Sequence, residues 1–289
     1  MSGAALLLIL AAAGLHATWN FFVKRIGGGV MLAWLLALFS TGLYAVPAVI
    51  IWRQTQATFS GTDLFFIGGS AVLHLAYFLT LQAGYRKGDL SLVYPLARGT
   101  APLLTTIGAI VILTERPGWL ALSGIVLIVG SVFFLTGGLS LFRGPRLPGA
   151  GEAIRYGLFT GMWIAAYSLW DKYAVGVLLL NPLLFSWFSS VARSIMLLPA
   201  AVTERAALRS LWRDHRNTAL LVAFLSSLAY ILVLTAMSFT DVSYVAPARE
   251  VSILFGAFLG ARILGEGHTR QRLLAAAGMV AGVVCLALG

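Results

Sequence analysis

Charged residues are scarce in this sequence. Aspartate, glutamate, lysine and arginine together make up 10% of the 289 residues, whereas hydrophobic residues make up 60%. A soluble globular domain carries roughly 25% charged residues, so this composition excludes an ordinary soluble domain. The sequence therefore predicts a protein that lies in a lipid bilayer.

The residues and motifs that metal and nucleotide chemistry need are also missing. Cys285 is the single cysteine, which excludes an internal disulfide and a cysteine-based metal cage. The chain has no P-loop, no aspartate pair at D-x-x-x-D spacing and no H-E-x-x-H motif. We therefore expect no metal, no other cofactor, no ATP-driven step and no enzyme activity. An integral membrane lipid-modifying enzyme is the remote alternative.

What the chain does contain is a series of long apolar runs. Spanning the ~30 Å hydrocarbon core takes about 20 apolar residues, and uniformly apolar runs of that length are helices. The predicted fold class is an all-α integral membrane protein with ten transmembrane helices. The runs cover residues 3–23, 30–52, 63–85, 90–113, 118–138, 153–173, 181–202, 217–239, 242–264 and 270–288.

The net charge of +10 comes from basic residues in the short loops between these runs, which fits membrane orientation and not a nucleic-acid partner. One side of the membrane would carry Arg53, Arg116 and Lys172. The other side would carry fourteen: Lys24, Arg25, Arg86, Lys87, Arg143, Arg146, Arg155, Arg205, Arg209, Arg213, Arg216, Arg262, Arg270 and Arg272. The positive-inside rule makes this side cytoplasmic, so both termini are predicted outside a bacterial inner membrane.

The two halves of the chain repeat one another. "LAYFLTLQAGYRKGDLSLVYPLARG", from Leu75, aligns with "LAYILVLTAMSFTDVSYVAPARE", from Leu228, and "ATWNFFVK" aligns with "AAYSLWDK". We predict a first five-helix repeat at 1–140, a connecting loop at 141–152 and a second repeat at 153–289. Because five is odd, the repeats would enter the membrane in opposite directions, which is typical of transporters.

With these motifs the sequence resembles the EamA-type members of the drug/metabolite transporter superfamily, and within it the amino-acid exporters of the YddG type. The resemblance rests on the aromatic first helix with Trp19, Asn20 and Lys24, the "LAY" motif, and the glutamates Glu115 and Glu266. Glycine-rich fifth and tenth helices complete the pattern. It implies two five-helix units and export of small metabolites.

Two arginines are the first candidates for a substrate site. Arg98 and Arg249 lie inside predicted spans, shortly after Pro95 and Pro247, each of which removes a backbone donor and predicts a helix break or hinge. A guanidinium group can hold a carboxylate through two parallel hydrogen bonds. Glu250 is predicted to receive an amino group or a proton. The alternatives are structural pairing of Arg249 with Glu250 and arginines that reach to the membrane interface.

Aromatic side chains at similar depth could surround an apolar or aromatic substrate group, or serve only as core and interface residues. With Asn20, these candidates are Trp19, Tyr77, Tyr94, Trp163, Tyr167, Tyr230 and Tyr244. His16 and His74 are candidates for proton coupling, with packing as the alternative. Arg193 is predicted to be a structural or gating partner, with Glu250 as one candidate for the acid it contacts. Glu115 and Glu266 are predicted to tie loops to nearby basic residues.

These features predict a secondary transporter that exports amino acids, including aromatic or other neutral ones, or related metabolites by alternating access about a central cavity. A carrier of a sugar, a phosphorylated metabolite or a drug-like cation is the alternative. The expected partners are a small-molecule substrate and the lipid bilayer. Glycine pairs Gly256/Gly260 and Gly278/Gly282 allow close helix packing. We expect a monomer, with a dimer as the alternative.

Overall fold

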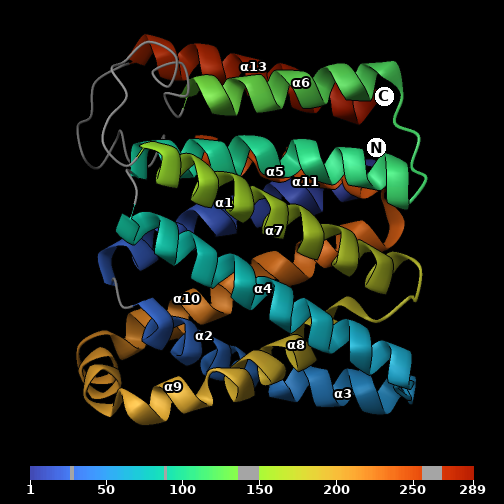
Figure 1. The fold of residues 1–289 in the computed structure, drawn as a ribbon. Coiled ribbons are helices and arrows are strands. Elements are labelled where there is room, and N and C mark those ends of the chain that lie inside the picture. Colours follow the sequence, from blue (N-terminus) through green and yellow to red (C-terminus); the bar gives the residue numbers. More distant parts are fainter. Residues whose placement is uncertain (27–28, 88–89, 136–149, 256–268) are drawn as a thin grey trace.

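The computed structural model describes residues 1–26, 29–87, 90–135, 150–255 and 269–289. Within these ranges every regular element is a helix, which agrees with the predicted all-α class (Figure 1). The helices are α1 (Gly3–Ile26), α2 (Gly29–Leu43), α3 (Ala45–Thr55), α4 (Gly61–Lys87), α5 (Leu90–Ile112), α6 (Trp119–Leu135), α7 (Ala150–Gly176), α8 (Pro182–Met196), α9 (Leu198–Thr203), α10 (Arg205–Phe239), α11 (Val242–Arg249) and α13 (Thr269–Leu288).

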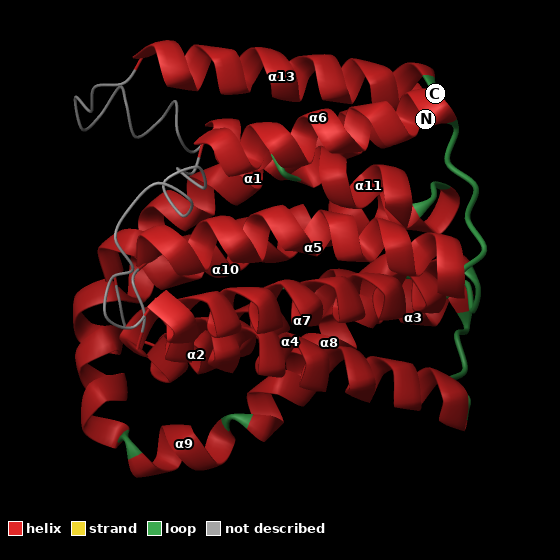
Figure 2. Ribbon diagram, turned by 45° about the horizontal axis from the view of Figure 1, so that its top comes forward, coloured by secondary structure: helices red, strands yellow, loops and turns green. Residues whose placement is uncertain are grey.

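The helices pair across the two halves of the chain. α1 packs on α10 and α4 packs on α7, while α2 contacts α8 and α6 contacts α13. In Figures 1 and 2, α6 and α13 lie together along one edge of the bundle, and α9 lies at the opposite edge. The central core includes the fully buried side chains of Ile9, Ile128, Phe185, Met237 and Met279. Helices from both halves therefore share one apolar core.

Large apolar side chains also cover much of the outer surface. Examples are Leu7 (71% exposed), Phe65 (63%), Val111 (72%) and Trp119 (87%). Contiguous exposed apolar surface of this extent is unfavourable in water and favourable against lipid chains. The surface and the apolar helices together indicate a multi-pass membrane protein.

Three helical segments have both the length and the composition to cross a membrane: Gly3–Val23, Gly61–Arg86 and Arg205–Phe239. α2 and α3 meet the same test as a pair, although they are bent by 50° with respect to each other. Leu96–Ile112, Trp119–Leu135 and Leu273–Leu288 are apolar but shorter. The count of ten spans therefore remains a prediction.

The polar stretch before the predicted span 217–239 is not a loop. α10 begins at Arg205 and runs for 35 residues, so "RAALRSLWRDHR" forms the first turns of the same helix. Alanine, leucine and arginine favour helix, and a polar helical segment can extend beyond the bilayer. The prediction placed the start of the helix where the sequence changes from polar to apolar, whereas the helix begins twelve residues earlier.

Polar side chains mark several helix starts. Asn181 accepts hydrogen bonds from the backbone nitrogens of Leu183 and Leu184 at the start of α8, and Pro182 occupies its first turn. α11 is capped from elsewhere: the two carboxylate oxygens of Glu115 accept from Val242 N (2.8 Å) and Ser243 N (2.9 Å). Glu115 was predicted to tie a loop to a basic residue, and that prediction is wrong, because a buried carboxylate satisfies free backbone donors at a helix N-terminus.

α6 and α13 approach each other closely at two glycines. A Cβ atom at Gly124 would lie 2.6 Å from the carbonyl oxygen of Gly282, and one at Gly282 would lie 2.7 Å from that of Gly124. Neither position can hold a larger side chain at this separation. Gly278 and Gly282 thus serve packing inside the chain, whereas Gly256 and Gly260 lie outside the described residues. The N- and C-termini meet at one end of the bundle, where the Met1 ammonium donates to the carbonyls of Leu286 and Ala287 (Figure 1).

Candidate functional site

A first polar cluster lies where α1, α5 and the end of α11 meet. Arg98 Nη1 donates to Glu250 Oε1 over 3.3 Å, and Arg98 Nη2 donates to His16 Nε2 over 3.1 Å. Glu250 is 5% exposed, so its charge is held almost entirely inside the protein. We call His16, Trp19, Asn20, Arg98, Arg249 and Glu250 the arginine cluster.

Arg249 is the member of this cluster that lacks a charge partner. It is half-buried at the last residue of α11, and none of the described residues forms a hydrogen bond or ion pair with its guanidinium group. It does act electrostatically on His16 and on Glu250. One guanidinium in this cluster is therefore neutralised by Glu250, while the other retains its positive charge.

A helix break positions Arg249 and Glu250. α11 contains Pro247 and ends at Arg249, Glu250 forms a turn, and helix resumes at Val251. Proline removes a backbone donor and disturbs the preceding turn, which accounts for a break at this point. α5, by contrast, runs without interruption from Leu90 to Ile112, through the backbone of Pro95. The two prolines therefore do not have the same effect on their helices.

Trp19 and Asn20 belong to the same end of α1 as His16. The His16 and Trp19 rings meet edge to face with centroids 4.7 Å apart, and Asn20 Nδ2 donates to the His16 carbonyl. Trp19 Nε1 and Glu250 Oε2 are buried, and neither has a hydrogen-bond partner among the residues that the structure describes. Buried polar atoms of this kind are costly unless a ligand or water satisfies them. The arginine cluster thus carries one donor and one acceptor that lack a protein partner.

A second polar cluster lies between α4, α7 and α10. Asp171 is 1% exposed; the Tyr230 hydroxyl donates to its Oδ2 atom, and His74 Nε2 lies 3.9 Å from the same oxygen. Asp171 Oδ1 is buried with no hydrogen-bond partner. We call Ser70, His74, Tyr167, Asp171 and Tyr230 the aspartate cluster. Across the described residues, no group of three His, Cys, Asp or Glu side chains could hold a metal ion.

The rings of the aspartate cluster pack on one another. His74 stacks on Tyr167 with ring centroids 4.1 Å apart and meets Tyr230 edge to face at 5.2 Å. Tyr77 packs against Tyr167 at 5.8 Å. Four predicted site residues, His74, Tyr77, Tyr167 and Tyr230, are thereby brought together around an aspartate.

The other predicted residues lie away from the two clusters or outside the described residues. Trp163 is on α7, one turn before Tyr167 and half-buried. Tyr244 turns toward the C-terminus, where its hydroxyl donates to the Gly289 backbone oxygen over 3.2 Å, so it joins neither cluster. The side chains of Tyr94 and Pro95, and all of Glu266, lie outside the described residues.

Arg193 is not the partner of Glu250. Its Nε donates to the Ser189 carbonyl and its Nη2 to the Ser190 hydroxyl, both on its own helix α8, while Glu250 is paired with Arg98. Arg193 acts electrostatically on Asp171 and Tyr230 instead. The predicted pairing failed because a match by type and depth does not specify on which side of a helix an arginine lies.

Sequence reasoning missed Asp171. It considered Glu250 but not Asp171, because Asp171 falls near the end of the predicted span 153–173, next to Lys172. In the structure α7 continues to Gly176, and Lys172 points away, donating to the carbonyls of Met237 and Thr240 at the end of α10. The repeat held a signal: Asp171 aligns with Val23, so the acid appears in one half alone.

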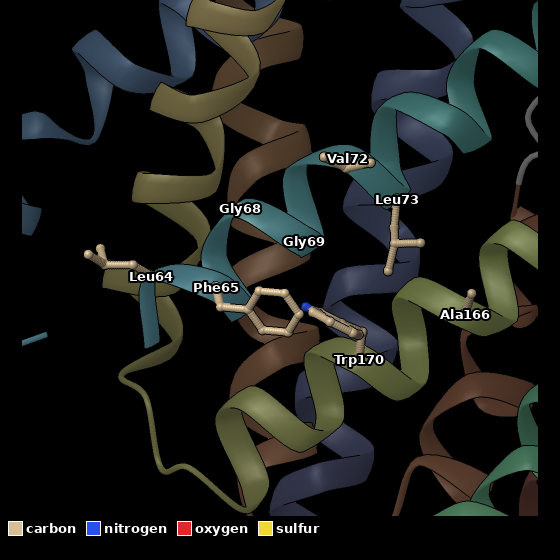
Figure 3. A pocket seen from close by; sticks show the side chains of 8 residues that line it. All are labelled: Leu64, Phe65, Gly68, Gly69, Val72, Leu73, Ala166 and Trp170. Carbon is tan, nitrogen blue, oxygen red and sulfur yellow. The ribbon is translucent and has the colours of Figure 1, made fainter. Parts of the chain in front are cut away.

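The apolar groove between α4 and α7 is separate from both clusters (Figure 3). It has a volume of about 500 Å³, and the rings of Phe65 and Trp170 in its lining pack against each other, tilted by 55° with centroids 5.3 Å apart. Its lining residues are Leu64, Phe65, Gly68, Gly69, Val72, Leu73, Ala166 and Trp170. Because Leu64, Phe65 and Val72 are more than 45% exposed on an apolar surface, this groove suits lipid chains and not a polar substrate.

Comparison with known proteins identifies the second half. Residues 153–288 match the model of the EamA-like transporter family. This region is an EamA-like transporter domain of the drug/metabolite transporter superfamily. It contains Tyr230 and Arg249, which have counterparts in the first half, and Asp171, Arg193 and Glu250, which have none.

Because the members of this family are transporters, the match over residues 153–288 implies that the protein transports small molecules. A solved structure titled "Crystal structure of protein" is similar over 100% of this chain and 98% of its own, with a TM-score of 0.79. At 14% sequence identity this similarity concerns the fold alone. The comparison with curated proteins returned no match.

Proposed function

We propose that this protein is a secondary transporter that exports amino acids, or related small metabolites with a carboxylate group, across the bacterial inner membrane. The proposal is carried by the half-buried, unpaired guanidinium of Arg249 at the helix break between Pro247 and Val251. A cation held inside an apolar bundle without a partner acid is costly, and a substrate carboxylate would supply the missing charge.

The neighbouring groups make Arg249 the better of the two arginines for this role. Arg98 is already paired with Glu250 and donates to His16. A carboxylate arriving at Arg98 would have to compete with Glu250, whereas one arriving at Arg249 meets an uncompensated charge. Trp19 Nε1 and Glu250 Oε2 are an unpaired donor and acceptor in the same cluster, suited to a substrate's second polar group.

We further propose ten spans arranged as two inverted five-helix repeats, 1–140 and 153–289, that rock about the arginine cluster in alternating access. Reciprocal contacts support this arrangement. Trp34 Nε1 donates to the carbonyl of Ser194, and Trp187 Nε1 donates to the carbonyl of Thr41. Trp34 aligns with Trp187, and each acceptor lies seven residues after the tryptophan of its own half, which is the pattern expected of two units related by a two-fold axis.

For orientation, we propose that the basic loops are cytoplasmic and that both termini face outward. The meeting of Met1 with Leu286 and Ala287 at one end of the bundle supports an even number of spans. Because Gly282 is used for packing against α6, it does not argue for a second copy, and we propose a monomer.

Uptake into proteoliposomes tests the function. The purified protein would be supplied with a panel of labelled neutral, aromatic and charged amino acids, with phosphorylated metabolites, sugars and quaternary cations as comparison arms. We expect saturable transport of at least one carboxylate-bearing compound. Transport confined to sugars or cations would refute the proposal while leaving the fold untouched.

Variants of the arginines then test the site. Arg249→Leu should abolish transport of that compound, and Arg249→Lys should leave weakened transport because a single ammonium cannot form the paired hydrogen bonds of a guanidinium. Arg213→Leu is the matched control, since Arg213 is an exposed arginine whose side chain is 81% accessible. Normal transport by Arg249→Leu would exclude Arg249 as the carboxylate site.

A further inference from the structure

The aspartate cluster contains a pair of groups that the proposed substrate site does not use. Asp171 and His74 come from α7 and α4; the rings of Tyr167 and Tyr230 pack on His74, and the Tyr230 hydroxyl donates to Asp171. An ionisable residue this deeply buried in a membrane protein is costly to keep unless it has a functional role. Its hydrogen bonds indicate what that role is.

The hydrogen bonds of His74 determine which nitrogen carries its proton. His74 Nδ1 lies 2.9 Å from the Ser70 carbonyl oxygen, which can only accept, so Nδ1 must donate. In a neutral imidazole, Nε2 then carries a lone pair. Nε2 lies 3.9 Å from Asp171 Oδ2, which is also an acceptor when the carboxyl is ionised. Two acceptors face each other, and a single proton on either one would turn the repulsion into attraction.

The remaining contacts of Asp171 leave room for one more proton. The Tyr230 hydroxyl donates to Oδ2 and the Ser70 hydroxyl also interacts with the carboxyl, while among the described residues Oδ1 has no hydrogen-bond partner. The charged groups acting on the carboxyl are Arg193 on α8 and Arg249 at the end of α11. Lys172, the next residue on α7, is held by carbonyls at the end of α10. No described residue therefore forms a direct ion pair with Asp171 apart from the His74 contact.

We propose that Asp171 and His74 together form the proton-binding site of a proton–substrate antiporter. The proton binds from water as an O–H on Asp171 or as an N–H on His74 and leaves again as the carrier changes its accessible side. No other bond forms or breaks. This assignment rests on the proposed export function, because an inward proton then exchanges for an outward substrate.

The position of Arg249 supplies the coupling between the two clusters. Its charge acts on His74 and on Asp171, so a carboxylate bound at Arg249 changes the electrostatic potential at the proton site. By reciprocity, the proton changes the affinity for substrate at Arg249. The charge of Arg249, a member of the arginine cluster, thus links proton and substrate binding.

The test uses the full-length protein in proteoliposomes with imposed pH gradients. An acidic lumen should drive accumulation of the labelled substrate in the wild type, since protons leaving the lumen exchange for entering substrate. Asp171→Asn should reduce accumulation to the level without a gradient but retain exchange of labelled for unlabelled substrate. Asp214→Asn, which changes an exposed aspartate, should behave as the wild type.

Several outcomes would overturn the proposal. These are gradient-driven accumulation by Asp171→Asn, accumulation driven only by an alkaline lumen, and wild-type exchange that no pH gradient affects. Absence of exchange by the wild type itself would refute the transport function instead. If Asp171→Asn fails to fold or to exchange, Tyr230→Phe decides the matter: it keeps the carboxyl but removes the hydroxyl bound to Oδ2, and it should move the pH midpoint of accumulation by about half a unit or more. An unmoved midpoint would then overturn the proposal.

Discussion

The two polar clusters bury one acid each but stabilise it differently. Glu250 is paired with a guanidinium, Arg98, at 3.3 Å, whereas Asp171 receives a hydrogen bond from the hydroxyl of Tyr230 and lies 3.9 Å from His74 Nε2. An acid held by a full positive charge stays ionised and anchors its surroundings. An acid held by neutral groups can gain or lose a proton without leaving an opposite charge stranded.

The comparison also separates the two halves of the repeat. Glu250 aligns with Gly99 and Asp171 aligns with Val23, so both acids belong to the second half. The tryptophan contacts, by contrast, are shared: Trp34 and Trp187 each donate to the other half. The aligned tryptophans thus make matched contacts, whereas each of the two buried acids lies in the second half without a counterpart in the first.

The largest expected effect comes from removing the charge that holds Glu250. Arg98→Leu should lower the free energy of unfolding by about 3–5 kcal/mol, because an unpaired carboxylate then stays inside the bundle. The double variant Arg98→Leu/Glu250→Leu should recover most of that loss. Denaturant unfolding of both variants in detergent measures the difference, and equal stability of the single variant and the wild type would show that Glu250 does not depend on Arg98.

An intermediate effect is expected at the cap of α11. Glu115→Ala removes both hydrogen bonds to Val242 N and Ser243 N and should lower the free energy of unfolding by about 1–2 kcal/mol. Because α11 ends at Arg249 and leads into the turn at Glu250, its displacement should lower substrate affinity. The dependence of transport on a pH gradient should persist.

Glu152→Ala is the control for this change, since Glu152 is an exposed acid in the first turn of α7. Binding assays and unfolding of the two variants give the comparison. Equal losses for Glu115→Ala and Glu152→Ala would mean that the cap of α11 has no special role in positioning the arginine cluster.

The smallest effect is expected at the exposed pair Arg213–Asp214, on the polar first turns of α10. The hydrogen bond from Arg213 lowers the pKa of Asp214 below its ordinary value. Its stabilising contribution is present above the ordinary pKa and is lost only as pH falls through the lowered one. Between about pH 5 and pH 8 Asp214 therefore stays ionised. Asp214→Asn should leave the pH profile of transport unchanged in that range; a shifted profile would mean that the proton response is not confined to the aspartate cluster.

Much of the fold and part of the candidate site could be predicted from local patterns. Apolar runs predicted the helices, Pro247 predicted a break close to Glu250, and the motifs indicated a family that residues 153–288 match. The start of α10 was missed because a polar stretch with good helix formers continues a helix beyond an apolar run. Glu115 and Arg193 were assigned wrong partners because side-chain direction depends on how helices rotate against each other.

The sequence by itself determined that this is an all-helical membrane protein of two similar halves, because hydrophobicity and periodicity act locally along the chain. Which charges meet was decided only by the tertiary structure. Arg98 and Glu250 are 152 residues apart, and Tyr230 and Asp171 come from different helices, so their contacts require the assembled bundle. The surroundings of each buried carboxylate are therefore a tertiary property: Glu250 lies beside a guanidinium and Asp171 beside a hydroxyl and an imidazole.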